Sequence, residues 1–103
     1  MIPTNVDILI THGPALNILD FADYSSHSGS DRLLAAIMRA KPKVHLFGHI
    51  HEAFGVSQNE ELGLLSVNSA QVDWRTTKVC NKANVIRATL QLDGSMGFAV
   101  VRE

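Results

Sequence analysis

The chain has 103 residues, of which 46% are hydrophobic and 18% are charged, and its formal net charge is −1. These values are typical of one globular domain, and no apolar run approaches the roughly 20 residues that cross a bilayer. The nine Lys and Arg residues are scattered, which argues against a binder of long nucleic acids, and a lone cysteine, Cys80, excludes an intramolecular disulfide and favours a cytoplasmic location.

The first predicted element is a strand at residues 6–11, followed by a long loop. The strand is apolar on both faces, as in a sheet that is covered on both sides, and it ends beside His12. Residues 13–29 are rich in Ser, Asp and Gly and predict a loop of a length that is often functional in compact domains. Within it, His27 is expected to face solvent, with a substrate-facing role as the alternative.

A helix is predicted over residues 31–40. Ser30 is a suitable N-cap, apolar residues recur at the i, i+3, i+4 spacing of one helical face, and Pro42 prevents continuation. The next strand spans residues 43–47, so the first half of the chain forms a β-α-β unit. The helix covers one face of this unit, whereas the sequence does not reveal what covers the opposite face.

Mostly antiparallel strands are predicted after the β-α-β unit. Two short strands near residues 54–57 and 64–68 are joined by a polar turn, and residues 70–83 are predicted to be a loop. The segments 84–92 and 96–102 flank the tripeptide Asp-Gly-Ser, which is a strong signal for a hairpin. The predicted fold class is therefore α/β, with a β-α-β unit, antiparallel strands and a C-terminal hairpin.

Two histidines follow the second core strand in a pattern that suggests a metal site. His49 and His51 stand two residues apart after Gly48, and alternate residues of an extended segment point to the same side. If the chain stays extended, their imidazoles converge in a manner that suits Zn, Mn, Fe or Ni. His12 ends the neighbouring strand, and parallel strands finish at one edge of their sheet, so three histidines are expected to meet there. His45 lies inside a strand and is interpreted as a core residue.

Three segments of the chain resemble the calcineurin-like metallophosphoesterase family. They are DILITHGP at residues 7–14, KPKVHLFGHIHE at residues 41–52 and VNSA at residues 67–70. Their order, spacing and flanking residues are similar to those of the C-terminal half of this domain, closest to the small phosphodiesterases related to the vertebrate brain metallophosphoesterases. The resemblance extends over nearly the whole chain, so residues 1–103 are interpreted as a partial metallophosphoesterase domain.

The resemblance implies a fold, a reaction and a set of ligands. The family fold is a four-layer αββα sandwich with a dinuclear metal site at the strand ends, and the reaction is hydrolysis of a phosphoester, foremost a phosphodiester, by metal-activated hydroxide. His12 and His49 would bind one divalent ion and His51 the other, with Mn, Fe or Zn as the metal. Asn68 is expected to support a turn rather than to contact the substrate.

The family motifs that lie upstream of the equivalent of Asp7 do not occur in these 103 residues. The family carries there an Asp-x-His motif, a Gly-Asp motif with the bridging aspartate, and a Gly-Asn-His motif with the catalytic histidine. We therefore expect the isolated chain to be inactive by itself. Uncovered strand edges pair with other chains, so we also expect association with a second copy or with a separately made N-terminal half. The expected substrate is a small phosphoester.

The sequence leaves two alternatives to an enzyme domain. The chain is a non-catalytic metal-binding or interaction module that keeps the three histidines, or it is a truncated gene product without an independent function. If the nucleotides upstream of the Met1 codon encode an Asp-x-His motif in the same reading frame, the chain is the truncated product.

Overall fold

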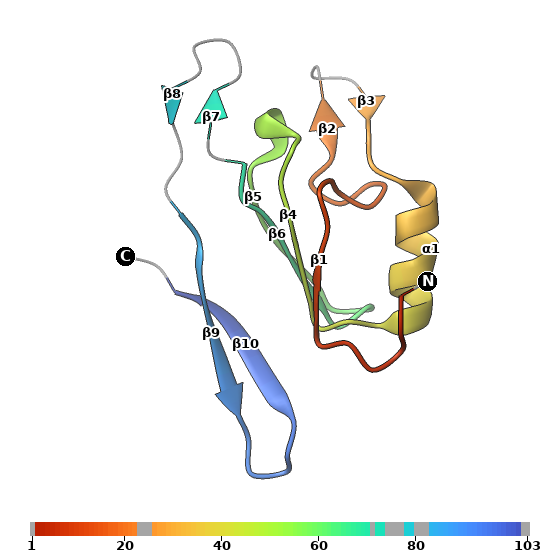
Figure 1. The fold of residues 1–103 in the computed structure, drawn as a ribbon, viewed down its shortest axis with the longest axis vertical. Helices are drawn as coiled ribbons and strands as arrows, with labels where there is room; N and C mark the ends of the chain where they lie inside the picture. Colours follow the sequence, from red (N-terminus) through yellow and green to blue (C-terminus); the bar gives the residue numbers. More distant parts are fainter. Residues whose placement is uncertain (1, 23–25, 71, 74–77, 80–82, 102–103) are drawn as a thin grey trace.

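A mixed sheet, one helix and a long hairpin make up most of the part of the chain that the structure describes (Figure 1). The computed structural model describes residues 2–22, 26–70, 72–73, 78–79 and 83–101. The elements are β1 (Ile8–Ile10), β2 (Phe21–Ala22), β3 (Ser26–His27), α1 (Asp31–Ala40), β4 (Val44–Phe47), the 3₁₀ helix η1 (His51–Ala53), β5 (Gly55–Asn59), β6 (Leu64–Asn68), β7 (Val72–Asp73), β8 (Lys78–Val79), β9 (Val85–Leu90) and β10 (Met96–Val101). Cys80 lies outside the described residues.

The central sheet has four strands in the order β1-β4-β6-β5. β1 and β4 are parallel, with Ile10 opposite Leu46, and β6 is parallel to β4, with Val67 also opposite Leu46. β5 runs antiparallel to β6 at one edge of the sheet. The predicted β-α-β unit is confirmed. Because three neighbouring strands are parallel, their carboxyl ends meet at the same edge of the sheet, which is the upper edge in Figure 1.

The helix α1 has the bounds that its capping residues dictate. The Ser30 hydroxyl accepts a hydrogen bond from the Leu33 N–H at 3.0 Å, which satisfies one of the unpaired donors of the first turn. At the other end, Lys41 adopts a left-handed conformation with φ 53°, and its N–H donates to the Ile37 carbonyl at 2.8 Å. Pro42 follows and cannot extend the helix. The predicted helix is thereby confirmed.

Side chains alternate along β6 and build two hydrophobic clusters on opposite faces of the sheet. Leu64 packs with Ala15 and with Ile37 of α1 on the helix side. The cluster on the other face joins β4 and β6 to the C-terminal hairpin, through Val44, Leu65, Val67, Ile86, Phe98 and Val100. The hairpin of β9 and β10 is therefore the cover for the second face, which the sequence did not reveal.

β1 is an edge strand and is less buried than its apolar sequence predicts. Leu9 packs against the helix-side cluster, but Ile8 and Ile10 on the opposite face are 43% and 73% exposed. The prediction of a strand covered on both faces is wrong here, because the hairpin covers β4 and β6 and not the outer strand. The outer side of β1 therefore presents an unpaired, apolar edge within the described residues.

Both segments predicted as loops contain short strand pairs. β2 and β3 pair antiparallel within residues 13–29, with Phe21 opposite His27, and β7 pairs antiparallel with β8 within residues 70–83. A Cβ at Gly29 would lie 2.2 Å from the Ala15 carbonyl oxygen, so only glycine fits this close approach. Strands of two residues are too short to leave a period-two pattern in the sequence, which is why they were not predicted.

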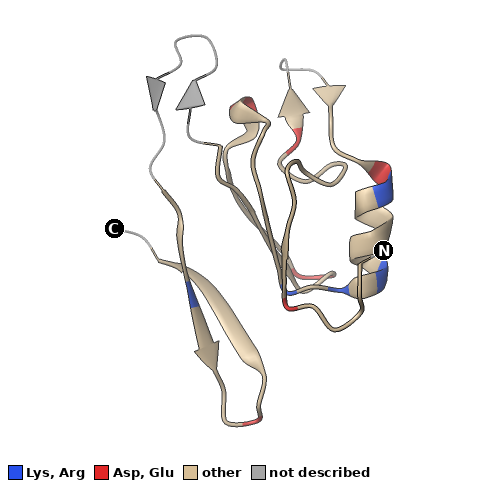
Figure 2. Ribbon diagram, in the orientation of Figure 1, with Lys and Arg blue, Asp and Glu red and all other residues tan. Residues whose placement is uncertain are grey.

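The C-terminal hairpin is confirmed and its turn follows from the Asp-Gly-Ser sequence. Asp93 Oδ1 accepts hydrogen bonds from the Ser95 N–H at 2.9 Å and hydroxyl at 2.6 Å, and Gly94 takes φ 88°. Figure 2 shows basic residues spread over α1, the start of β4 and β9 rather than gathered on one face. In the described segments, no helix combines the length and apolar character required to span a membrane.

Candidate functional site

The carboxyl ends of β1 and β4 bring His12 and His49 into contact. Backbone pairing continues past both strands, since the Thr11 N–H donates to the Leu46 carbonyl at 3.0 Å and the Gly48 N–H to the His12 carbonyl at 3.1 Å. The two imidazole rings have centroids 4.4 Å apart and are tilted by 39°. Both residues are exposed. Two predicted ligands from two strands therefore lie side by side and open to solvent.

The chain does not stay extended after Gly48, in contrast to the expectation from the sequence. His49 has a positive φ of 71°, and the Ile50 N–H donates to the Gly48 carbonyl at 2.8 Å. A hydrogen bond across three residues with a positive central φ is the rarer, strained form of the γ-turn. A non-glycine residue held in such a region costs about 1–3 kcal/mol and is often found at functional sites. The strain falls on His49 itself, and the turn points its ring toward His12.

His51 follows this turn as the first residue of η1 and not as the next outward position of a strand. It is partly buried, and its Nδ1 atom is buried without a hydrogen-bond partner in the described structure. Among residues 2–22, 26–70 and the later described segments, no group of three His, Cys, Asp or Glu side chains is arranged to hold a metal ion. The structure thus pairs His12 with His49 and leaves His51 one turn away.

His45 lies beneath the site and supports the His12 turn. Its side chain is fully buried, and its Nε2 is 2.8 Å from the Thr11 hydroxyl, which donates its own hydrogen to the Gly13 carbonyl at 2.7 Å. His45 Nε2 therefore carries the hydrogen in this bond, which leaves Nδ1 as a bare acceptor. Burial lowers the pKa of His45 to about 4, so the ring is neutral near pH 7. This agrees with the interpretation of His45 as a core residue.

Asn68 ties the histidine turn to the loop that precedes β2. Its side chain is fully buried at the end of β6, and its Nδ2 donates to the Ile50 carbonyl at 2.9 Å and to the Leu19 carbonyl at 3.2 Å. Its Oδ1 accepts from the Ala70 N–H at 3.1 Å. Leu19 also has a positive φ of 51°. One amide therefore holds three backbone segments together, which is the structural role expected for Asn68.

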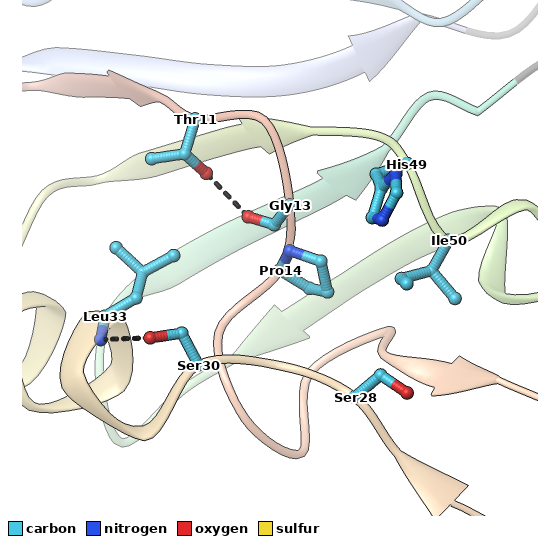
Figure 3. A pocket seen from close by; sticks show the side chains of 8 residues that line it. All are labelled: Thr11, Gly13, Pro14, Ser28, Ser30, Leu33, His49 and Ile50. Atoms are coloured by element: carbon cyan, nitrogen blue, oxygen red, sulfur yellow. Dashed lines mark hydrogen bonds between the residues drawn. The ribbon is translucent and has the colours of Figure 1, made fainter.

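An open pocket lies beside His49. It has a volume of about 360 Å³ and is lined by residues from three segments, 11–14, 28–33 and 49–50. Figure 3 shows His49, Pro14 and Ser28 around it, with the Thr11 hydroxyl turned to the Gly13 carbonyl on the far side. The volume suits a small ligand.

A buried aspartate pairs with an exposed histidine near the same edge. Asp20 is 1% exposed and its Oδ1 lies 2.6 Å from Nδ1 of His27, whose side chain is 38% exposed. The Asn17 and Gly29 N–H groups donate to the other oxygen, Oδ2, at 2.9 and 3.0 Å. Burial by itself raises the pKa of Asp20, but the hydrogen bonds from His27 and the two backbone amides outweigh it and lower the pKa below the usual value of 3.8.

Comparison with known proteins gives several relatives, each similar to this chain over part of its own length. No protein-family model matches the chain. Metallophosphoesterase domain-containing protein 1 of Homo sapiens is 48% identical over 58 residues, which cover 54% of this chain and 18% of that protein, and the Mus musculus protein gives the same values. A UPF0046 protein of Caenorhabditis elegans is 38% identical over 87 residues, which cover 84% of this chain and 26% of that protein. The chain is similar to part of a metallophosphoesterase-domain protein. It spans about a fifth to a quarter of the length of these relatives.

The structure brings together some of the predicted metal ligands and leaves another apart. His12 and His49 are in contact, His51 lies in the next turn, and their role as metal ligands stays a prediction. The pair of Asp20 and His27 was missed, because the two residues stand seven apart in a segment without periodicity. A buried carboxylate in a Ser-rich segment leaves no pattern in the sequence.

Proposed function

We propose that this chain supplies the histidine part of a metal-dependent phosphoesterase site. His12, His49 and His51 would hold a divalent ion, which we take to be Mn, Fe or Zn, since imidazole suits all three. The observation that carries the proposal is the contact of the exposed His12 and His49 rings at the ends of adjacent parallel strands. Nδ1 of His51 supports it as well, since among the described residues this buried atom has no hydrogen-bond partner, which is costly unless a ligand engages it.

The three histidine ligands suit a site with one metal ion better than a site with two. When bound, a divalent ion polarises a phosphoryl oxygen and lowers the pKa of a bound water. The imidazoles of this chain are neutral ligands, so they add no negative charge to offset a second nearby dication. We therefore propose that a dinuclear site and phosphodiester hydrolysis require carboxylate ligands from another polypeptide segment, either a second copy or a separate N-terminal half.

The pocket beside His49 is the proposed place for the substrate. Its volume of about 360 Å³ has room for a small phosphoester, and its wall includes the Ser28 and Ser30 hydroxyls. These hydroxyls and the backbone of the His12 turn are the polar groups available to orient the ester. We place this activity in the cytoplasm, since the sequence holds a single cysteine.

The test is hydrolysis of bis(p-nitrophenyl) phosphate with Mn²⁺, together with calorimetric titration of Mn²⁺ into the purified chain. His51→Ala is the test variant, and Gln58→Ala, at an exposed position of β5, is the control. Activity that His51→Ala abolishes and Gln58→Ala keeps would support the whole proposal. Metal binding without hydrolysis would exclude a second copy as the source of the carboxylates and leave a separate N-terminal half. No metal binding in the unchanged chain would refute the proposal.

A further inference from the structure

The pair formed by Asp20 and His27 has the features of a functional histidine and takes no part in the hydrophobic core. The carboxylate is almost fully buried, whereas the imidazole that it holds is more than a third exposed. The Phe21 ring packs on one side of the imidazole, with centroids 4.1 Å apart. The carboxylate bonds to Nδ1, and the aromatic contact restricts the ring, so the second nitrogen, Nε2, has a fixed direction.

The hairpin that carries this pair is anchored to the candidate site. β2 lies against η1, which begins at His51, and Figure 1 shows both at the same end of the molecule. Asn68 bonds to the carbonyl of Leu19, directly before Asp20, and to the carbonyl of Ile50, between the two histidines. Ser28, the residue after His27, lines the pocket together with His49. His27 is therefore the direct neighbour of a residue that lines the proposed substrate pocket.

We propose that His27, positioned by the buried Asp20, binds a phosphoryl oxygen of the substrate through its Nε2–H. This inference rests on the proposed phosphoesterase function and adds a substrate-binding group to it. With a hydrogen on each ring nitrogen, the imidazole donates Nδ1–H to the carboxylate and Nε2–H to a phosphate oxygen, and such charge-assisted hydrogen bonds are stronger than neutral ones. In this assignment His27 contacts the substrate, and Asp20 is a positioning residue.

The substitution Asp20→Asn separates positioning from folding. An asparagine keeps one oxygen for the Asn17 and Gly29 N–H groups, but it presents an amide donor to Nδ1 of His27 in place of Oδ1. His27 must then lose its Nδ1 hydrogen to keep a bond with that amide. The imidazole ¹⁵N shifts report this loss of the Nδ1 hydrogen directly, and a purely structural role for Asp20 would not produce it.

The experiment is titration of inorganic phosphate into the metal-free, ¹⁵N-labelled chain at about pH 6. Sodium chloride of equal ionic strength is the blank. We expect saturable phosphate shifts at His27, affinity about tenfold weaker in His27→Gln and in Asp20→Asn, and unchanged affinity in Ser26→Ala, which alters an exposed hydroxyl of the same hairpin.

Three results would overturn the inference. These are His27 shifts no larger than the chloride blank, equal phosphate affinity in His27→Gln and the unchanged chain, or an Nδ1 hydrogen that Asp20→Asn leaves in place. The failure of the proposed function has a different signature. The proposed function fails if the chain does not bind Mn²⁺ in the calorimetric titration. The phosphate titration at His27 contains no metal, so its result does not depend on that outcome.

Discussion

Replacing Asn68 with alanine tests whether one buried amide holds the site together. The change removes two donated hydrogen bonds and one accepted bond, and it leaves the Leu19 carbonyl without its donor, whereas the Ile50 carbonyl still accepts from the Ala53 N–H. Each such bond contributes about 0.5–1.5 kcal/mol, and a buried group left unsatisfied costs about 1–3 kcal/mol. We therefore expect the free energy of unfolding to fall by about 3–5 kcal/mol, a large share of the roughly 5–15 kcal/mol typical of a domain.

The assay is urea denaturation, with Ser66→Ala as the matched control. Ser66 lies on the same strand and is equally buried, but its hydroxyl has no hydrogen-bond partner in the described structure. Removing it should change the free energy of unfolding by less than about 1 kcal/mol or increase it, because an unpaired buried hydroxyl is itself unfavourable. The reasoning is refuted if Asn68→Ala costs no more than Ser66→Ala. Asn68→Asp should destabilise at pH 7 as well, because a carboxylate would face two carbonyl oxygens.

Three further predictions concern the pH dependence, the metal and the sheet edge. The pKa of His45 is about 4 in the folded chain and 6.5 in the unfolded chain, so the unfolded chain takes up a proton first as the pH falls. The free energy of unfolding should therefore fall by about 3 kcal/mol between pH 6.5 and pH 4. In His45→Gln, denaturation at a series of pH values should lack this decrease. In Mn²⁺ calorimetry, His49→Ala should lose binding whereas His45→Ala should lose stability, and equal metal loss in both variants would contradict the ligand assignment. Because the edge of β1 is exposed, we expect the purified chain to self-associate and Ile10→Lys to weaken this association. A sedimentation mass that stays that of a monomer at every concentration would exclude the association.

Local sequence patterns predicted the elements that rest on local chemistry. The helix begins after Ser30 and ends before Pro42 because the N-cap hydroxyl and the proline ring act on adjacent backbone groups. The C-terminal hairpin follows in the same way from Gly94 and its neighbours, since the turn needs a positive φ at that position. His12 and His49 could be predicted to approach each other because consecutive parallel strands end at one edge.

The burial of each face was decided by strand order and not by strand sequence. Ile8 and Ile10 are as apolar as Val44 and Leu46, but they lie on an edge strand that the hairpin does not reach. Apolar residues predict a face that can be buried, whereas the identity of its cover depends on segments distant in the chain. The packing of β9 and β10 on β4 and β6 is such a long-range choice.

By itself, the sequence determined the helix, the core strands, the hairpin and the two histidines that meet at the strand ends, because each depends on residues within a few positions or on the parallel β-α-β connection. Only the tertiary structure decided the γ-turn at His49, the Asn68 crosslink and the pairing of Asp20 with His27. These features depend on which backbone groups are buried together and need partners, and that information arises only when distant segments pack.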